Sequence, residues 1–355
     1  MVTLDRTSPV GNLYAGGDIV ADGKITNATD ITFKATDNIG VVGLYVKKPN
    51  ADSAEVFTTE TMFTDEGEYE FYAVDGAGNK SPTFRILLDK TKPTIEVKGG
   101  ETVLSGGAKT NAAFLKMTAH DGLSGLDKLF VKLPGDNGFV EYTDSAQLAA
   151  EGEYSFYATD RAGNNSETVT VLLDRSKPVG HVYAGETETQ SGTFTNADHV
   201  KYSATDSLSG LAEIYVKKPG DSKAVVFSSG TVFTKEGLYE FYAVDQAGNK
   251  SDTIRITLDK TNPTLTLYAG NTHVSAGAKT NAAFIKMQAS DGLSGIAKLF
   301  VKLPGAGEFT EYVSGTQLMA EGEYSFYAVD VAGNISDTVK LLSDRTKPTG
   351  VLFAA

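Results

Sequence analysis

The chain has 355 residues, of which 41% are hydrophobic and 37 are glycine, and it contains neither cysteine nor tryptophan. Its 45 acidic and 32 basic side chains give a formal net charge of −13, which argues against a nucleic-acid partner because phosphate binding needs a basic surface. The absence of cysteine excludes a thiol nucleophile and disulfide bonds, so packing, metal ions or both must stabilise the domains.

The sequence is a fourfold repeat. A motif of the form Asp-Arg/Lys-Thr/Ser-x-Pro begins at Asp5, Asp89, Asp174, Asp259 and Asp344, at intervals of 84, 85, 85 and 85 residues. A longer block, residues 66–79 in its first copy, recurs four times. These periods predict immunoglobulin-like repeats at residues 7–90, 91–175, 176–260 and 261–345, with residues 1–6 ending a preceding repeat and residues 346–355 beginning a following one.

Alternate repeats match each other best. Residues 109–114 of the second repeat return unchanged as residues 279–284 of the fourth, and residues 44–49 of the first are nearly restated by residues 214–219 of the third. The sequence therefore predicts that the true unit is a pair of repeats.

Within a repeat, the pattern predicts short strands joined by turns. Residues 31–36 alternate apolar and polar side chains, as in a strand with one buried face, and residues 69–74 alternate in the same way. Residues 84–88 are β-rich and end at the next Asp-x-Thr-x-Pro linker. No segment has a sustained helical period, and strands at this spacing give about seven strands per repeat, as expected for an immunoglobulin-like β-sandwich.

An aromatic spacing sharpens this prediction. Tyr69 stands two residues before Phe71, which takes the place that a disulfide cysteine occupies in other immunoglobulin-like domains. The hydroxyl of Tyr69 is then expected to bond back to the backbone as a tyrosine corner. The arrangement recurs at Tyr154, Tyr239 and Tyr324.

Residues 75–81 (Asp-Gly-Ala-Gly-Asn-Lys-Ser) and 89–93 (Asp-Lys-Thr-Lys-Pro) resemble the closing turn and the linker of tandem bacterial immunoglobulin-like (BIg) repeats of large cell-surface adhesins and biofilm proteins. The resemblance covers essentially the whole chain. It implies an all-β fold of four tandem immunoglobulin-like β-sandwich domains in an elongated rod, in an extracellular protein on the bacterial surface or secreted. The module serves in stalks, adhesive tips and enzyme accessory domains, so it leaves the role open.

Three acidic positions recur in every repeat: one ends an early strand, one opens the Asp-x-Ala-Gly-Asn turn and one begins the linker. In an immunoglobulin topology, the first two loops lie at one pole, which the incoming linker also reaches. Calcium prefers six to eight such oxygen ligands, so a calcium site is expected at each domain junction, and the resemblance implies that calcium stiffens the rod. The candidate ligands are Asp37, Asp75, Asp89, Asp121, Asp160, Asp174, Asp206, Asp245, Asp259, Asp291, Asp330 and Asp344, with Asp5 before the first repeat.

Turn chemistry is the alternative explanation of these aspartates. The Asp of Asp-x-Ala-Gly-Asn can accept hydrogen bonds from its own turn, while Gly and Asn take left-handed conformations, and the linker proline can fix the start of the next strand. The spacing also lacks the denser Asp-x-Asp-x-Asp pattern of dedicated calcium loops. Both explanations can hold together, so the sequence leaves open whether an ion is present.

Catalysis is not expected. The four histidines, His120, His181, His199 and His273, have no histidine counterpart in the sister repeats, and no Gly-x-Ser-x-Gly elbow occurs. No apolar run is long enough for a membrane segment, and the N-terminus has no signal-peptide pattern. Intramolecular Lys–Asn isopeptide bonds stay open.

The sequence favours a structural stalk or spacer, a monomeric fragment that holds other parts of a protein away from a cell. Its partners, a surface protein or glycan of a host or neighbouring cell, would be contacted by parts outside this chain. One alternative is a glycan- or protein-binding module, for which residues 45–48 and 215–218 (Tyr-Val-Lys-Lys) offer an aromatic and basic face. Another is an accessory segment of a secreted polysaccharide-active enzyme.

Overall fold

The computed structural model describes residues 4–143 and 146–351, in which 32 strands and no helix are present. The chain divides into two compact units, Met1–Arg175 and Ser176–Ala355, each of which holds two repeats. The predicted remnants of neighbouring repeats, residues 1–6 and 346–355, lie partly outside the described residues. The residue boundaries of the single repeats stay predictions.

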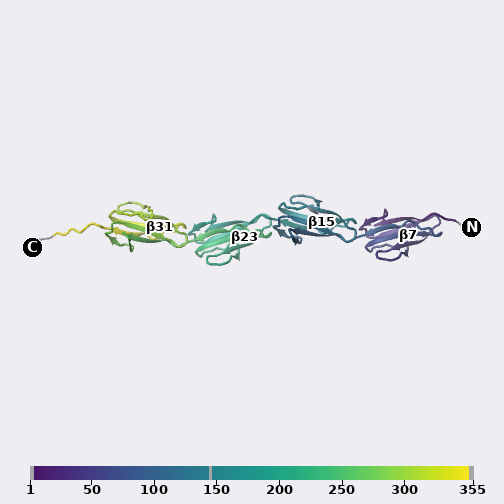
Figure 1. The fold of residues 1–355 in the computed structure, drawn as a ribbon, viewed down its shortest axis with the longest axis horizontal. Coiled ribbons are helices and arrows are strands. Elements are labelled where there is room, and N and C mark those ends of the chain that lie inside the picture. Colours follow the sequence, from purple (N-terminus) through teal and green to yellow (C-terminus); the bar gives the residue numbers. More distant parts are fainter. Residues whose placement is uncertain (1–3, 144–145, 352–355) are drawn as a thin grey trace. The chain divides into compact units, whose positions relative to one another are not determined.

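Every repeat contains eight strands in the same order, and Figure 1 labels the longest strand of each. The first repeat contains β1 (Val10–Ala15), β2 (Asp18–Val20), β3 (Lys24–Thr26), β4 (Ile31–Thr36), β5 (Val41–Lys47), β6 (Glu55–Phe57), β7 (Gly67–Asp75) and β8 (Phe84–Leu88). The second contains β9 (Thr94–Gly99), β10 (Thr102–Leu104), β11 (Lys109–Thr110), β12 (Leu115–His120), β13 (Leu126–Lys132), β14 (Val140–Glu141), β15 (Gly152–Asp160) and β16 (Val169–Leu173).

The second unit repeats this plan. Its first repeat contains β17 (Val179–Ala184), β18 (Thr187–Thr189), β19 (Thr193–Thr195), β20 (Val200–Thr205), β21 (Leu211–Lys217), β22 (Val225–Phe227), β23 (Gly237–Asp245) and β24 (Ile254–Leu258). Its second contains β25 (Thr264–Ala269), β26 (Thr272–Val274), β27 (Lys279–Thr280), β28 (Ile285–Ser290), β29 (Ile296–Lys302), β30 (Thr310–Glu311), β31 (Gly322–Asp330) and β32 (Val339–Ser343).

The strands of a repeat form two sheets that face each other. In the first repeat, a three-stranded sheet has the order β2-β1-β4 and a five-stranded sheet has the order β3-β8-β7-β5-β6. All of their strand pairs are antiparallel except β3–β8, which is parallel. The protein is therefore all-β, with four tandem β-sandwich domains, as the sequence predicts.

The core of each sandwich contains the alternating positions that the sequence marks as apolar. Ile31 and Phe33 of β4 and Tyr69, Phe71 and Ala73 of β7 are fully buried in one cluster. The predicted tyrosine corner is confirmed in all four repeats, where the hydroxyl donates to the carbonyl four residues upstream at 2.7–2.8 Å. The pairs are Tyr69–Asp65, Tyr154–Ala150, Tyr239–Lys235 and Tyr324–Ala320.

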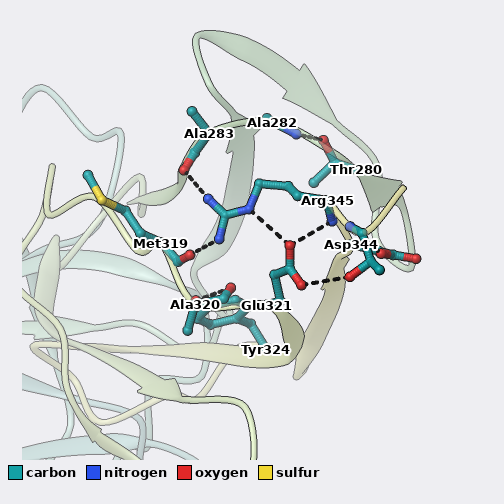
Figure 2. A network of polar contacts seen from close by, with 10 residues as sticks. Thr280, Ala282, Ala283, Met319, Ala320, Glu321, Tyr324, Asp344 and Arg345 are labelled. Carbon is teal, nitrogen blue, oxygen red and sulfur yellow. Dashed lines mark hydrogen bonds and ion pairs between the residues drawn. The ribbon is translucent and has the colours of Figure 1, made fainter. Parts of the chain in front are cut away.

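The cation that follows the linker aspartate at the end of each repeat folds back onto the repeat that the chain is leaving, as seen for Lys90, Arg175, Lys260 and Arg345. Figure 2 shows Arg345, whose guanidinium donates to the carbonyls of Ala283 (2.9 Å) and Met319. Its backbone amide donates to Glu321 Oε1 at 3.1 Å, and Thr346 Oγ1 donates to Glu321 Oε2 at 3.0 Å. The linker therefore begins as a fixed extension of the sandwich.

Candidate metal centre

Within the units, the structure brings the three predicted acidic positions together at the pole where a repeat begins. In the second repeat, Asp121 follows β12, Asp160 ends β15, and Asp89 arrives on the linker that follows β8 of the first repeat. One carboxylate oxygen of each lies within 4.8 Å of the others. The same grouping occurs for Asp5, Asp37 and Asp75 and for Asp259, Asp291 and Asp330.

The loop after β12 is organised by its own aspartate. Asp121 Oδ1 accepts hydrogen bonds from the backbone amides of Leu123 (3.2 Å) and Gly125 (2.7 Å). Gly125 has a φ of 81°, which side chains other than glycine adopt at a cost. Its carbonyl accepts the amide of Arg161 at 3.0 Å, and this bond ties the loop to the turn that follows β15.

The turn after β15 agrees with the predicted turn chemistry in part. Asp160 Oδ1 accepts the amides of Gly163 and Asn164, both at 2.8 Å, and Gly163 has a φ of 96°. The expected left-handed asparagine is wrong, because Asn50 is the only non-glycine residue with a positive φ in residues 4–143 and 146–351. The Asn164 side chain instead donates to Asp160 Oδ2 at 2.7 Å and to the carbonyl of Asp89 at 3.0 Å.

The linker aspartate forms hydrogen bonds with both repeats of its unit. Asp89 has an exposed fraction of 0%, and its backbone amide donates to the carbonyl of Thr26 in the first repeat at 2.9 Å. Its Oδ1 accepts the amide of Thr91 at 3.0 Å, and its Oδ2 accepts the amide of Ser124, in the second repeat, at 2.9 Å. The carboxylate is therefore held in one position before any ligand is considered.

The second unit contains an independent copy of this arrangement. Asp259 also has an exposed fraction of 0%, and its Oδ2 accepts the amide of Ser294 at 3.0 Å. The Asn334 side chain donates to the carbonyl of Asp259 at 2.9 Å and to Asp330 Oδ2 at 2.7 Å. Asp291 Oδ1 accepts the three amides of residues 293, 294 and 295.

The donor set fits a hard divalent cation. Calcium–oxygen distances of about 2.4 Å allow two ligand oxygens of one ion to lie up to about 4.8 Å apart, and the carboxylate oxygens of each group lie within that separation of one another. Among the described residues, none of these nine aspartates forms an ion pair, so no side-chain cation offsets their mutual repulsion. Three of their oxygens are buried and lack a hydrogen-bond partner among those residues: Asp5 Oδ2, Asp37 Oδ2 and Asp121 Oδ2.

Hydrogen bonding favours the charged form of two of these carboxyls, those of Asp75 and Asp291. Burial acts to raise the pKa of Asp75, but the Asn79 side chain and the backbone amides of the turn outweigh burial and hold that pKa below its ordinary value. The pKa of Asp291 is lowered in the same way, since backbone amides led by that of Gly295 outweigh burial. Asp75 and Asp291 therefore offer ionised oxygen ligands at neutral pH.

The remaining predicted ligands are placed within their own units. Asp174 is fully buried and donates its amide to the carbonyl of Thr110 at 2.9 Å. In the second unit, Asp206 Oδ1 accepts the amide of Gly210 at 2.7 Å, and Asp245 Oδ1 accepts the amide of Asn249 at 2.8 Å. Asp344 Oδ1 accepts the amide of Thr346 at 3.0 Å. A shared site for Asp174, Asp206 and Asp245 stays a prediction.

The tyrosine of the predicted ligand-binding face stacks on a tyrosine of the neighbouring strand. Tyr45 of β5 stacks on Tyr72 of β7 with ring centroids 4.9 Å apart, and the Lys80 ammonium lies 3.6 Å from the centroid of Tyr72. β5 lies on one side of β7 and the segment that contains Lys80 pairs on the other, so Tyr72 uses both ring faces internally. Tyr215, Tyr242 and Lys250 repeat the stack in the third repeat. This packing does not favour sugar stacking on Tyr72 or Tyr242.

Comparisons with known proteins add little beyond the fold. No family model and no curated protein matches the chain. The chain is similar to the fibronectin(III)-like modules of CbhA from Clostridium thermocellum, at 19% identity, covering 43% of this chain and 90% of that one with a TM-score of 0.23. It is also similar to the N-terminal eight Ig domains of Down Syndrome Cell Adhesion Molecule, at 10% identity, covering 96% of this chain and 57% of that one with a TM-score of 0.23.

A third similar structure is SGBP-B of the Bacteroides ovatus mixed-linkage glucan utilization locus, solved with a mixed-linkage heptasaccharide. It is 13% identical, and the match covers 95% of this chain and 100% of that one with a TM-score of 0.16. At TM-scores this low, none of these likenesses carries an argument about what the chain does. No helix among the described residues is long and apolar enough to cross a membrane.

Proposed function

We propose that the chain is a non-catalytic stalk or spacer segment of an extracellular bacterial surface or secreted protein, and that calcium binds at the junctions between its repeats. Among the described residues, the groups of aspartates at the poles recur within both units and supply oxygen ligands suited to a cation. A spacer needs junctions that keep consecutive domains in a fixed relation, and the contacts of the linker support that requirement.

The observation that carries this proposal is the position of Asp89. It is fully buried, it is bonded to both repeats of its unit, and it lies in a group of three carboxylates without an ion pair among the described residues. Asp121 contributes an oxygen that is buried and has no hydrogen-bond partner in those residues. Like charges this close repel one another, and a divalent cation between them reverses the sign of the interaction. Calcium would thereby stabilise the junction.

The linker supports a stiff rather than a hinged connection. On the side of the first repeat, the Lys90 ammonium donates to the carbonyls of Thr29 (2.8 Å) and Thr64 (2.9 Å), and Thr91 Oγ1 donates to Glu66 Oε2 at 2.9 Å. On the side of the second repeat, Asn164 and Ser124 hold Asp89 as described above. Little of this linker is free to rotate about its backbone torsions.

Thermal melting of the 355-residue chain with calcium and with a chelator tests the proposal. Binding to the folded state alone stabilises it by about 2.7 kcal/mol at a hundredfold excess of ligand over its Kd, so calcium should raise the melting temperature by several degrees. The double variant Asp121→Asn and Asp291→Asn should lose the part of this shift that belongs to the second and fourth repeats, while the first repeat keeps its own group of Asp5, Asp37 and Asp75. The control is Asp127→Asn, which removes the same charge from an exposed position and should keep the shift. An equal melting temperature in calcium and chelator for the native sequence would refute the calcium site.

A further inference from the structure

The linker aspartate joins the candidate cation site of one repeat to a strand pair of the repeat before it. The amide of Asp89 donates to the carbonyl of Thr26, the last residue of β3, while its carboxylate faces the site formed with Asp121 and Asp160. In the second unit, the amide of Asp259 donates to the carbonyl of Thr195, the last residue of β19, at 2.9 Å. A single residue thus has its backbone in one sandwich and its side chain in the next.

The strand at the receiving end is short and lies at a sheet edge. β3 has only three residues, lies at the edge of the five-stranded sheet and pairs with β8 alone. Its register with β8 runs from Lys24 opposite Ile86 to Thr26 opposite Leu88, and the Asp89 amide closes the pair at its C-terminal end. Short edge strands open locally more readily than central strands, so a single terminal hydrogen bond has a large share in keeping β3 in place.

We infer that a cation at the pole of one repeat stabilises the parallel strand pair of the preceding repeat through the linker aspartate. The inference rests on the proposed calcium site. An ion that holds the Asp89 carboxylate also holds the Asp89 backbone, and with it the bond to Thr26. The coupling runs from the second repeat to β3–β8 in the first, and from the fourth repeat to β19–β24 in the third.

Hydrogen exchange of the full chain, read by mass spectrometry with calcium and with a chelator, measures this coupling. Protection of one terminal hydrogen bond corresponds to about fivefold slower exchange, expected at residues 23–28 and 84–90 of the first repeat and at residues 192–197 of the third. The first repeat has its own acidic cluster, so a calcium response at residues 23–28 could arise from that cluster or from the cluster of the second repeat. A pair of variants separates these two origins. Asp121→Asn should abolish the calcium response at residues 23–28 and leave that at residues 192–197 intact. Asp37→Asn should leave both responses.

Calcium binding is measured on the same samples by calorimetry, which separates the two failures. Binding to the native sequence with slower exchange confined to the repeat that contains the site would overturn the coupling and leave the site intact. The absence of any binding would overturn both. Asp121→Asn could unfold the second repeat, which would be seen as lost protection of β15. In that case the comparison of the native sequence with Asp37→Asn tests the coupling. A calcium response at residues 23–28 that survives Asp37→Asn cannot come from the first repeat's own cluster, whereas loss of that response in Asp37→Asn would overturn the coupling.

Discussion

The asparagine that closes the turn after β31 offers the sharpest test of how a junction is held. Asn334 has an exposed fraction of only 8%, and its side chain donates to the carbonyl of Asp259 at 2.9 Å and to Asp330 Oδ2 at 2.7 Å. Its φ is not positive, so alanine fits the backbone without strain. Asn334→Ala therefore removes two hydrogen bonds and changes nothing else in the turn.

The size of the effect follows from the two bonds. A hydrogen bond to a charged acceptor contributes about 2 kcal/mol and a neutral one about 1 kcal/mol, so the substitution should destabilise the fourth repeat by about 3 kcal/mol. For a domain of this size, that loss lowers the melting temperature by about 15 °C. Asn334→Asp should cost more, since it places a carboxylate, the fourth in this group, against Asp330 and the carbonyl of Asp259.

Four linked domains do not unfold as one two-state system, so the assay must resolve single repeats. Urea-dependent hydrogen exchange, followed peptide by peptide, reports the stability of each repeat separately. Asn281→Ala, an exposed asparagine in the same repeat, is the matched control and should have an effect within about 0.5 kcal/mol. The reasoning is refuted if Asn334→Ala leaves the fourth repeat as stable as the control does, or if it weakens the first and second repeats equally.

Three further outcomes are expected. Tyr154→Phe should cost about 1.5 kcal/mol in the second repeat, because it leaves the Ala150 carbonyl without its donor; urea unfolding measures this. Asn50→Ala should cost about 1 kcal/mol, while Asn50→Gly should be close to neutral, because Asn50 has a φ of 60° that alanine resists. Burial raises the pKa of the corner tyrosines above their ordinary 10.0, because it disfavours the phenolate in the folded state. The free energy of unfolding should therefore hold below pH 10 and fall as the pH rises through the folded-state pKa. Phenolate absorbance and circular dichroism should change together over that pH range. These tyrosines are Tyr69, Tyr154, Tyr239 and Tyr324.

The fold could be predicted from the sequence where the signal is local. The tyrosine corner depends on a spacing of four residues between the hydroxyl donor and its acceptor, and the alternation of β4 and β7 has a period of two. The parallel pairing of β3 with β8 joins segments about 60 residues apart, and β3 has too few residues to show an alternation. The predicted elongated rod stays a prediction for scattering experiments.

The candidate site, too, could be predicted in part, and its contacts between repeats could not. Its aspartates are visible because they recur, and topology alone brings Asp121 and Asp160 to one pole. The role of Asn164 was missed, because its second acceptor, the carbonyl of Asp89, lies 75 residues away and belongs to the preceding repeat. The sequence carries a signal for this role, since Asn occupies the position in all four repeats, but the conformation of a tight turn accounts for such an Asn equally well.

Calorimetric titration of the metal-free 355-residue chain with calcium is the most direct test of the central claim. The account predicts saturable binding that is reduced in steps, with one site lost in Asp121→Asn and a second lost when Asp291→Asn is added, while Asp127→Asn binds like the native sequence. The absence of binding at millimolar calcium, or the same stoichiometry in all four proteins, would contradict it.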